Sequence, residues 1–462
     1  MDKTREKLVA YAADLDYADL TPAAIHAVKR SIVDSIGCAY GAFLAEPMIA
    51  GRNLASQVTA TRPATIIGTQ IKSSPELAAF ANGAMIRYLD FSDDYFGGSG
   101  ETGPHPSDNI GAILAATEST GADGRTLILG IAIAYEVCGQ IVDDSRLQAR
   151  ERGRGWDYPI FHSISTSLGA GKVLGLSREQ MRNALSLAIV PNICINQTRH
   201  GEFSNWKGFA GPNGSRNGLF ATLVAKEGVT GPADPFEGKA GYMKQLDDPF
   251  KLGTFGGKGT PFKIEQTFFK CLPVRYTVQL PIWAALEIRN KIKLQDIEAV
   301  NAYIENQRVV TRADYPAYWN PRTRETADHS TAYLIGAALV DGEITARTFT
   351  PERYRDPAIL ALVQKIRLVG DKEYTAAYPR AFHCRLEVTL KSGEVLSVHK
   401  TNPKGHVANP MSDRELEEKF LEQAQGLLPR NQSRALLDRL WELDKLDDVG
   451  KLFALMLVPA KN

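Results

Sequence analysis

The spacing of apolar residues changes twice along this chain of 462 residues. Before residue 262 and after residue 403, apolar residues recur mostly at intervals of three and four, which is the spacing of helices packed on a core. Between these points, short runs alternate apolar and polar residues, as strands do. We therefore expect a mainly α fold with a smaller α+β domain. The predicted large domain comprises residues 1–261 and 404–462, and the smaller domain comprises residues 262–403.

The strand candidates of the smaller domain are short and bounded by turn residues. Residues 300–304 and 366–369 each show a strand-like pattern. Residues 385–390 and 395–399 flank the sequence Lys-Ser-Gly-Glu, which is typical of a hairpin turn. One further candidate, residues 64–67, interrupts the helical first half.

Several helix starts can be read from capping residues. Thr21 followed by Pro22 predicts one start, and Ser177 with Gln180 forms a capping-box pattern before another. Residues 127–137 are nearly all apolar, which predicts a buried helix.

Small residues recur in the helical half, notably Gly111, Gly169 and Gly171. A residue without a bulky side chain lets two helix backbones approach closely. We expect tight helix–helix contacts at these positions.

Composition argues against several classes of partner and cofactor. The net charge is +1, with 44% hydrophobic and 23% charged residues, so neither nucleic acid nor an acidic membrane surface is indicated. No apolar run reaches the ~18 residues of a membrane-spanning helix, and the start of the sequence lacks the apolar region of a signal peptide, so a cytoplasmic location is expected. The scattered cysteines disfavour a disulfide framework, a zinc site or an iron–sulfur cluster. They are Cys38, Cys138, Cys194, Cys271 and Cys384.

Three carboxylates, a glycine-rich loop and a histidine fall within sixteen residues. Asp90, Asp93 and Asp94 follow an apolar helical run, and His105 comes after the loop at 97–103. A carboxylate near a like charge has a raised pKa and can transfer protons. Such a cluster is also compatible with Mg²⁺ binding for diphosphate chemistry, or with a solvated turn after a helix. We favour proton transfer on a small molecule, with the loop closing over the site.

His105 precedes Pro106, which favours an extended backbone and lets the imidazole project from the loop. Ser107 or Asp108 is then expected to cap the following helix. The alternative is a structural histidine.

Two further segments carry cations. Arg199, Lys207 and Arg216 lie in or near a segment rich in Gly and Asn, and Lys207 precedes a predicted helix N-terminus, which favours anion binding. Lys270 and Arg275 flank Pro273 and could hold a carboxylate. The alternatives are an exposed loop lysine and a charged helix start.

Taken in order, these segments resemble the MmgE/PrpD family, which includes 2-methylcitrate dehydratases, cis-aconitate decarboxylases and some epimerases. The resemblance covers essentially the whole chain. The segments that carry it are Leu89-Asp-Phe-Ser-Asp93, His105-Pro-Ser-Asp-Asn109, Gly155-Trp-Asp157, Gly171-Lys-Val-Leu-Gly-Leu176, Trp206-Lys207, Phe269-Lys270 with Pro273, Thr323 to Ser330, Asp341-Gly342, and Gly405-His406 with Asn409-Pro-Met411.

The resemblance implies a large helical domain formed by both chain ends and a smaller α+β lid domain. It also implies a homodimer that uses no metal and no organic cofactor. Among the residues, it makes Asp90 and His105 active-site residues, and it makes Lys207 and Lys270 lysines that bind substrate or handle protons.

The sequence departs from the decarboxylase branch of that family. Asp94 stands where those enzymes tend to have Thr, Asp157 and Tyr158 stand where they have a His, and Arg275 stands where they have another His. Asp157 after Gly-Trp is closer to the dehydratase branch, although that branch usually has His at the position of Tyr158.

These observations lead to one hypothesis: a lyase that removes water from a citrate-like di- or tricarboxylate such as 2-methylcitrate. Asp90 or His105 would take a proton, the partner residue would protonate the departing hydroxyl, and Lys207 would assist. The expected substrate-binding residues are Lys270, Arg275, Arg199, Asp94, Asp157 and Tyr158. Decarboxylation of cis-aconitate and epimerisation of a related acid remain the alternatives.

Overall fold

The computed structural model contains two compact units, each with its own hydrophobic core. The residues that it describes are 2–97, 103–145, 155–192, 194–257 and 259–460.

Neither unit is a single stretch of chain. Unit 1 combines Met1–Asn196, Gly208–Thr267 and Ser412–Asn462. Unit 2 combines Gln197–Lys207 with Phe268–Met411. Unit 2 thus includes Arg199 and Lys207, which the sequence analysis placed in the helical domain.

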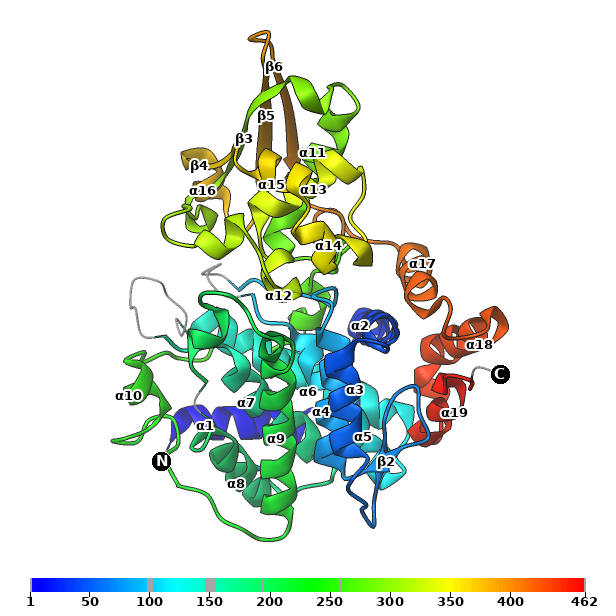
Figure 1. Cartoon of the computed structure of the whole chain (residues 1–462). Coiled ribbons are helices and arrows are strands. Elements are labelled where there is room, and N and C mark those ends of the chain that lie inside the picture. Colours follow the sequence, from blue (N-terminus) through cyan, green and yellow to red (C-terminus); the bar gives the residue numbers. More distant parts are fainter. Residues whose placement is uncertain (1, 98–102, 146–154, 193, 258, 461–462) are drawn as a thin grey trace. The chain divides into compact units, whose positions relative to one another are not determined.

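Unit 1 is mainly helical (Figure 1). Its few strand residues form a two-stranded antiparallel pair, β1 (Ala64–Thr65) and β2 (Lys72–Ser73), at the predicted position near residue 64. The helices are α1 (Lys3–Asp14), α2 (Pro22–Ala42), α3 (Glu46–Ala55), α4 (Pro75–Arg87), α5 (Ile110–Thr120), α6 (Gly124–Asp144), α7 (Pro159–Val173), α8 (Arg178–Ile189), α9 (Ala210–Lys226), α10 (Tyr242–Leu246), α17 (Asp413–Ala424), α18 (Arg430–Trp441) and α19 (Leu452–Met456).

Most of the predicted helix starts are confirmed. The Thr21 side chain accepts a hydrogen bond from the backbone N–H of Ala24 at the start of α2. At α8, Ser177 and Gln180 form the predicted capping box. The start expected at Ser107 or Asp108 is wrong, because a 3₁₀ turn, Pro106–Asn109, precedes α5 and occupies both residues. The N–H of Ser107 is held by Asp93 in the preceding loop rather than by a cap.

Helix α6 is the buried helix predicted around residues 127–137. Every residue from Leu127 to Val142 in it is buried. By length and composition alone, α6 is the one described helix that could cross a membrane, or one of two if the bent pair of α2 and α3 counts as a span. Since 89% of its most apolar stretch lies inside the protein, α6 also fits the core helix of a globular unit.

Glycines set the distance between some of these helices. A Cβ added to Gly111 of α5 would lie 2.6 Å from the backbone nitrogen of Gly83 in α4, and one added to Gly169 of α7 would lie 2.5 Å from the carbonyl oxygen of Gly130 in α6. Gly171 differs, because its nearest neighbour would be the Met181 side chain at 3.5 Å. The close approach expected from sequence therefore occurs at two of the three glycines.

The C-terminal helices belong to unit 1. Helix α17 packs on α2, where Lys419 donates hydrogen bonds to Asp34 at 2.6 Å and to the carbonyl oxygen of Phe91 at 2.8 Å. The Phe420 ring lies edge-on to Tyr40, with 6.0 Å between their centroids.

Unit 2 is built on a four-stranded mixed sheet with the order β4-β3-β5-β6. Strand β3 runs parallel to β4 and antiparallel to β5, and the β5–β6 hairpin forms at the predicted turn. The strands are β3 (Ile297–Glu305), β4 (Ile366–Asp371), β5 (His383–Leu390) and β6 (Val395–Thr401).

The buried face of this sheet packs against helices of the same unit. Val300, Leu386 and Val398 alternate with less buried residues along their strands and share one core with α11 and α13. The helices are α11 (Gln279–Arg289), α12 (Arg324–Ala327), α13 (Thr331–Asp341), α14 (Pro351–Tyr354), α15 (Pro357–Val363) and α16 (Lys372–Ala377). The expected fold class, mainly α with a smaller α+β part, is confirmed.

Candidate active-site residues

Asp90 lies just beyond the end of α4 and is 1% exposed. Its backbone adopts φ = 53°, a left-handed conformation that Asp tolerates better than most residues. One carboxylate oxygen accepts a hydrogen bond from Arg87 Nη1 at 2.9 Å. Burial lowers the pKa of Arg87, but the interactions with Asp90, Tyr158 and Asp108 together outweigh it, so the pKa lies well above its ordinary value. The Arg87–Asp90 pair is therefore ionised inside the protein.

His105 has a defined orientation beside Asp90. Its backbone is extended, as expected before Pro106. Its Nδ1 lies 2.5 Å from the carbonyl oxygen of Asp93, and a carbonyl can only accept, so Nδ1 carries the proton. Nε2 faces Asp90, with 3.8 Å between Nε2 and Oδ1. A neutral His105 therefore presents an Nε2 lone pair, as a general base does.

Asp93 supports this arrangement and is itself buried. Its carboxylate accepts hydrogen bonds from the backbone N–H of Ser107 at 3.1 Å and from the Tyr135 hydroxyl at 2.8 Å. Burial raises the pKa of Asp93 to about 7, although these hydrogen bonds act in the opposite direction. The side chain of Asp93 thus fixes the turn after His105, and its carbonyl fixes the imidazole.

Asp94 is also buried, at 4% exposure. The next residue, Tyr95, donates its backbone N–H to the carbonyl oxygen of Pro104, which joins the two ends of the glycine-rich loop. Residues 98–102 of that loop, for which a lid role was predicted, lie outside the described residues.

Asp157 and Tyr158 have different roles. The Asp157 carboxylate accepts a hydrogen bond from the backbone N–H of Tyr158 at 2.9 Å, so it shapes the start of α7. The Tyr158 ring lies edge-on to His105, with 6.0 Å between centroids, and edge-on to His162 at 5.4 Å. Tyr158 therefore borders the imidazole that the sequence analysis singled out.

Behind Tyr158 lies a second imidazole–carboxylate pair. His162 Nε2 and Asp108 Oδ2 are 3.3 Å apart, and both side chains are fully buried. The hydroxyls of Ser165 and Thr166 both donate hydrogen bonds to the side-chain oxygen of Asn109. This polar layer fixes α7 against the turn that follows His105.

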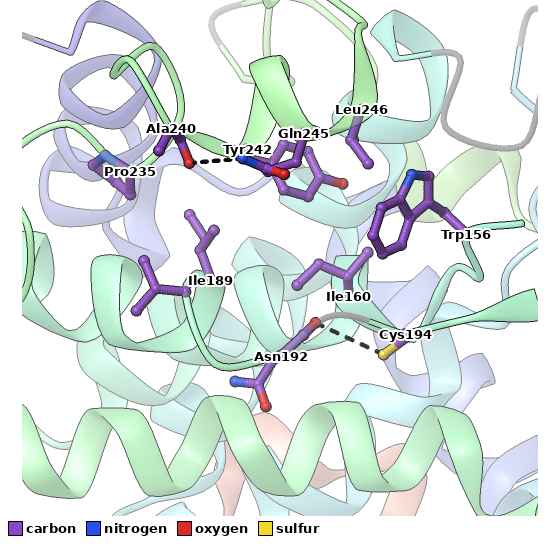
Figure 2. Close-up of a pocket in the computed structure, with 11 residues that line it drawn as sticks. Trp156, Ile160, Ile189, Asn192, Cys194, Pro235, Ala240, Tyr242, Gln245 and Leu246 are labelled. Atoms are coloured by element: carbon purple, nitrogen blue, oxygen red, sulfur yellow. Dashed lines mark hydrogen bonds between the residues drawn. The ribbon is translucent and has the colours of Figure 1, made fainter. Parts of the chain in front are cut away.

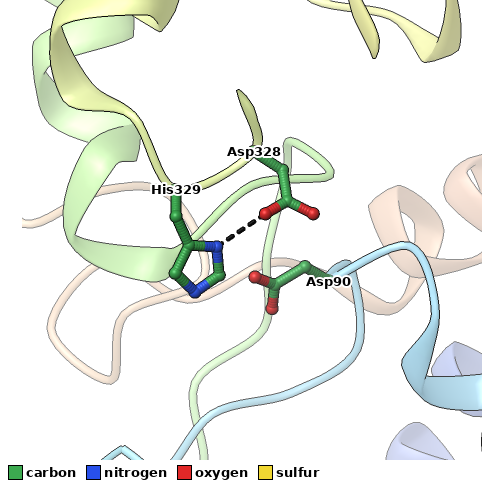
Figure 3. Close-up of side chains that lie close together, drawn as sticks. All are labelled: Asp90, Asp328 and His329. Atoms are coloured by element: carbon green, nitrogen blue, oxygen red, sulfur yellow. Dashed lines mark hydrogen bonds and ion pairs between the residues drawn. The ribbon is translucent and has the colours of Figure 1, made fainter. Parts of the chain in front are cut away.

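Unit 2 contains its own cluster of charged groups around Asp328, which is fully buried. Lys207 Nζ donates to Asp328 Oδ1 at 2.7 Å, and Arg324 Nη1 lies 3.1 Å from Oδ2. His329 Nδ1 lies 2.6 Å from Oδ1, as the dashed line in Figure 3 shows. Because the carboxylate fixes the proton on Nδ1, His329 presents Nε2 as its reactive nitrogen.

The segment that carries Lys207 is fixed to unit 2 by specific hydrogen bonds. The backbone N–H of Phe203 donates to the Thr326 hydroxyl at 2.9 Å, and Asn205 donates to Glu325 at 2.8 Å. These contacts explain why residues 197–207 belong to unit 2 rather than to the helical unit 1. Lys207, predicted to be catalytic and to bind an anion or handle protons, is paired with a carboxylate of the protein.

The charges of Arg275 and Arg199 both influence the pKa of Tyr318. Burial raises the pKa of Tyr318, the charges of Arg275 and Arg199 lower it, and that of Asp328 raises it. The backbone N–H of Arg275 also donates to the carbonyl oxygen of Asp328 at 3.0 Å. Unit 2 therefore brings together Lys207, Arg199 and Arg275, three of the predicted cations.

Lys270 is fully buried, so its ammonium is withdrawn from bulk water. Its neighbour Phe269 donates a backbone hydrogen bond to the carbonyl oxygen of Gly405 at 3.0 Å. Gly405 has φ = 94°, and an added Cβ would lie 2.1 Å from the Phe269 carbonyl oxygen, so only glycine fits there. Next to Lys270, Cys271 donates its N–H to Gln279. The backbone on both sides of Lys270 is thus held in place.

Four side chains at these sites were not selected from sequence: Arg87, Tyr135, Asp328 and His329. Arg87 stands three residues before Asp90, a spacing at which side chains meet around a helical turn. Asp328 and His329 lie in the segment Thr323 to Ser330, which carried part of the family resemblance without a role assigned to either residue. Tyr135 carried no local signal, since it is one aromatic residue in an apolar helix.

Within unit 1, the described partners of Asp90 and Asp93 give the magnesium interpretation of the acidic cluster little support. Asp90 is paired with a guanidinium, and both oxygens of Asp93 accept hydrogen bonds from protein donors. The raised pKa of Asp93 also favours its protonated form, which is a poor ligand for a hard cation.

Two family models match most of the chain. Residues 6–254 match the MmgE/PrpD N-terminal domain, and residues 273–443 match the MmgE/PrpD C-terminal domain.

Similar proteins carry two different activities in their names. A cis-aconitate decarboxylase of Homo sapiens is 25% identical, over 96% of this chain and 93% of that protein. A mitochondrial 2-methylcitrate dehydratase of Yarrowia lipolytica is 26% identical, over 94% and 86%, respectively. A 2-methylcitrate dehydratase of Cupriavidus necator is 27% identical, over 82% and 81%.

Proposed function

The chain belongs to the MmgE/PrpD family, and from that premise we propose that it is a carbon–oxygen lyase. Its substrate is a citrate-like tricarboxylate such as 2-methylcitrate, from which it removes water without a metal or an organic cofactor. The names of the dehydratase relatives support this reaction class.

The observation that carries the proposal is the state of His105. Its Nδ1 donates to the carbonyl of Asp93, so in the neutral imidazole Nε2 carries the lone pair that accepts a proton. Asp90 Oδ1, 3.8 Å from Nε2, can stabilise the imidazolium that forms, while Arg87 keeps Asp90 ionised. A general base with a carboxylate beside it is what removal of a proton next to a substrate carboxylate requires.

Dehydration needs a second proton transfer, because hydroxide is a poor leaving group. We assign His105 to the removal of the carbon-bound proton. His329, oriented by Asp328, is a second imidazole that can protonate the departing hydroxyl, and Lys207 on the same carboxylate can share this role. The carbon–hydrogen and carbon–oxygen bonds break, a carbon–carbon double bond forms, and water leaves.

The substrate brings about three negative charges, and burying them without partners would be prohibitive. Lys270, Arg275 and Arg199 are the cations proposed to bind its carboxylates. They would also stabilise the enolate-like charge that appears when the proton leaves. Asp94, Asp157 and Tyr158 are proposed to shape the surroundings of His105.

Decarboxylation of cis-aconitate is the second candidate, because a relative of that name aligns with nearly the whole chain. It needs a proton donor to the carbanion but no protonation of a hydroxyl. The departures at Asp94, Tyr158 and Arg275 weigh against it. Epimerisation of a related acid is a third possibility, in which a proton is removed and returned without elimination.

The test is a panel of citrate, 2-methylcitrate and cis-aconitate with products identified by NMR. An unsaturated tricarboxylate from 2-methylcitrate supports the proposal. Carbon dioxide released from cis-aconitate, or deuterium exchange without elimination, would instead establish one of the alternatives. Activity that survives dialysis against EDTA excludes the magnesium reading.

Variants test the assignment of the base. His105→Ala should lower kcat by about 10²–10⁴-fold while the protein stays folded. His26→Ala is the matched control, because this histidine is half-exposed and hydrogen-bonded only to Asp413 among the described residues. Near-normal turnover in His105→Ala would remove His105 from the mechanism, and a similar loss in His329→Ala would support its assignment as the acid.

A further inference from the structure

A lysine of the C-terminal segment contacts the turn that carries Asp90 and Asp93. Lys419 of α17 is buried, with its side chain only 6% exposed. Its Nζ donates a hydrogen bond of 2.8 Å to the carbonyl oxygen of Phe91, the residue that follows Asp90. The same ammonium lies 3.8 Å from the centroid of the Phe91 ring. Lys419 therefore holds both the backbone and the side chain of Phe91.

The Asp34 carboxylate of α2 pairs with this ammonium inside the protein. Lys419 Nζ donates to Asp34 Oδ1 at 2.6 Å, and Asp34 is itself buried. A buried charge is tolerated beside a group of opposite charge, whereas alone it would be strongly unfavourable. A charged donor also makes a stronger hydrogen bond to a carbonyl than a neutral donor does. The ion pair thus provides a strong donor for the Phe91 carbonyl.

Glycines of α2 allow both α17 and the turn to pack closely against this helix. An added Cβ on Gly37 would lie 3.1 Å from the Cα of Phe420 in α17. One helical turn later, an added Cβ on Gly41 would lie 2.7 Å from Cδ1 of Leu89, the residue before Asp90. Helix α17 and the turn therefore meet neighbouring positions of α2, which fixes where Lys419 reaches the turn.

His105 takes its orientation from the end of the same turn. Its Nδ1 donates to the carbonyl oxygen of Asp93 at 2.5 Å, and Asp93 is two residues after Phe91. Each residue has only two soft backbone dihedral angles, so a displaced Phe91 carbonyl also displaces the carbonyl of Asp93. The contact of Lys419 is thus transmitted to the imidazole through two residues of backbone.

We propose that Lys419 is a positioning residue for His105. By holding Phe91, it keeps the Asp93 carbonyl where Nδ1 can donate to it, and so keeps the neutral imidazole in the tautomer with its lone pair on Nε2. The consequence for turnover rests on the proposed function, in which His105 is the base. The tautomer itself can be measured without substrate.

The test compares the full-length wild type with two variants. Asp34→Asn removes the ion pair and keeps the amino group of Lys419 beside the Phe91 carbonyl. The double variant Asp34→Asn/Lys419→Met also lacks the ion pair, leaves no unpaired charge, and has no donor for that carbonyl. Comparing the two variants therefore separates the contact with Phe91 from the ion pair.

The readout is the tautomer of His105, obtained by NMR from the nitrogen chemical shifts of isotopically labelled histidine. The His105 signals are assigned by their loss in His105→Asn. The double variant should shift the tautomer ratio about fivefold from Nδ1–H towards Nε2–H, which is the effect of one neutral hydrogen bond. Asp34→Asn should keep the ratio of the wild type. An unchanged ratio in the double variant would overturn the proposal.

Turnover of the substrate identified in the panel is the second readout. The double variant should lower kcat by up to about 10²-fold, with a smaller change in KM, because a misplaced base affects proton removal more than binding. A shifted tautomer ratio with normal kcat would confirm the contact but contradict His105 as the base. The failure of the proposed function is thereby distinguished from the failure of this inference.

General destabilisation is controlled by a substitution elsewhere in unit 1. Ile189→Ala removes buried packing in the wall of a cavity whose described lining includes none of the proposed catalytic residues (Figure 2). This variant loses stability through the lost packing and should keep the wild-type tautomer ratio. A shift as large as that of the double variant would overturn the proposal.

A second substitution keeps the proposal testable if the double variant does not fold. Lys419→Gln in the Asp34→Asn background keeps a polar side chain, but its amide is one bond shorter than the lysine and falls short of the Phe91 carbonyl. The tautomer ratio should shift in the same direction as expected for Met. The wild-type ratio in this variant would count against the positioning role.

Discussion

Asp90 shows how one side chain can depend on a buried partner. Its carboxylate is withdrawn from water, and Arg87 supplies the charge that makes this tolerable. The two residues are three apart, so the end of α4 builds the pair locally. His105 reaches the same carboxylate from the far side of the glycine-rich loop. The proposed proton transfer therefore depends on the pairs Arg87–Asp90 and Asp90–His105 rather than on single residues.

Removing Arg87 should therefore destabilise the protein strongly. Arg87→Ala removes the guanidinium that pairs with the buried Asp90 carboxylate, and we expect a loss of about 3–5 kcal/mol in the free energy of unfolding. Urea unfolding followed by circular dichroism measures it. Arg414→Ala is the matched control, since the Arg414 side chain is 86% exposed and pairs with Glu418 at the surface. Its effect should stay within about 0.5 kcal/mol, and an equally small effect of Arg87→Ala would contradict the pairing argument.

Asp93 should make stability depend on pH. Its pKa rises from 3.8 to about 7 on folding, so between these values the folded protein holds a proton that the unfolded chain has released. Raising the pH through this window therefore lowers stability. Asp93→Asn removes this titrating group and should reduce the slope between about pH 5 and pH 7 by up to about 1.4 kcal/mol per pH unit. Unfolding curves across that range would refute the assignment if the two proteins showed the same slope.

At the scale of elements, helix contact sets the positions of the proposed catalytic residues. Helix α4 leads into Asp90, and α5 follows the turn after His105. These two helices touch at Gly83 and Gly111, where the backbones are too close for a Cβ. The separation of α4 and α5 thus bears on the Asp90–His105 distance.

Gly111→Ala tests this contact. The added methyl would meet backbone atoms of α4, which cannot move aside as a flexible side chain can. We expect a loss of about 1–3 kcal/mol in stability, together with reduced turnover of the substrate identified in the panel.

Gly171→Ala serves as the control for this substitution. Gly171 is also a buried helical glycine, but its new methyl would meet only the Met181 side chain at an ordinary 3.5 Å. The change should be neutral or stabilising by up to about 1 kcal/mol, because Ala favours helix over Gly. Equal effects of the two substitutions would show that the α4–α5 distance is not critical.

At the scale of the whole molecule, unit 1 depends on the C-terminal segment. Lys419 of α17 pairs with the buried Asp34 of α2, and Phe420 packs where a Cβ on Gly37 would lie 3.1 Å from its backbone. Further core residues come from α18, namely Leu436, Leu437 and Leu440. The core of unit 1 is therefore incomplete without the helices of the C-terminal segment.

A chain that ends at Met411 should fail to form a stable unit 1. It loses Lys419, which pairs with Asp34, and a set of fully buried leucines, so we expect little folded protein and no cooperative unfolding transition. A chain that ends at Val458 is the control, because it keeps α17 to α19 and the hydrogen bond from Val458 to Gly68. Cooperative unfolding of the shorter chain, seen by circular dichroism, would contradict this dependence.

Much of the architecture could be predicted from local patterns. Alternating apolar residues located the strands of unit 2, and capping residues located the starts of α2 and α8. The start of α5 was misjudged, because Asp93, fourteen residues earlier, holds the N–H of Ser107. A contact across a loop cannot be recognised from the spacing of neighbouring residues, whereas a capping residue within the first helical turn can.

The sequence by itself determined the fold class and the local group of Asp90, Asp93 and His105, because periodicity and short spacing are properties of neighbouring residues. Only the tertiary structure decided which nitrogen of His105 carries the proton in the neutral imidazole, that Arg87 pairs with Asp90, and that Lys207 shares Asp328 with His329. Lys207 and Asp328 are 121 positions apart. Such pairs form because the folded chain brings residues that are far apart in sequence into contact. They persist because a buried charge is stable only beside a group of opposite charge.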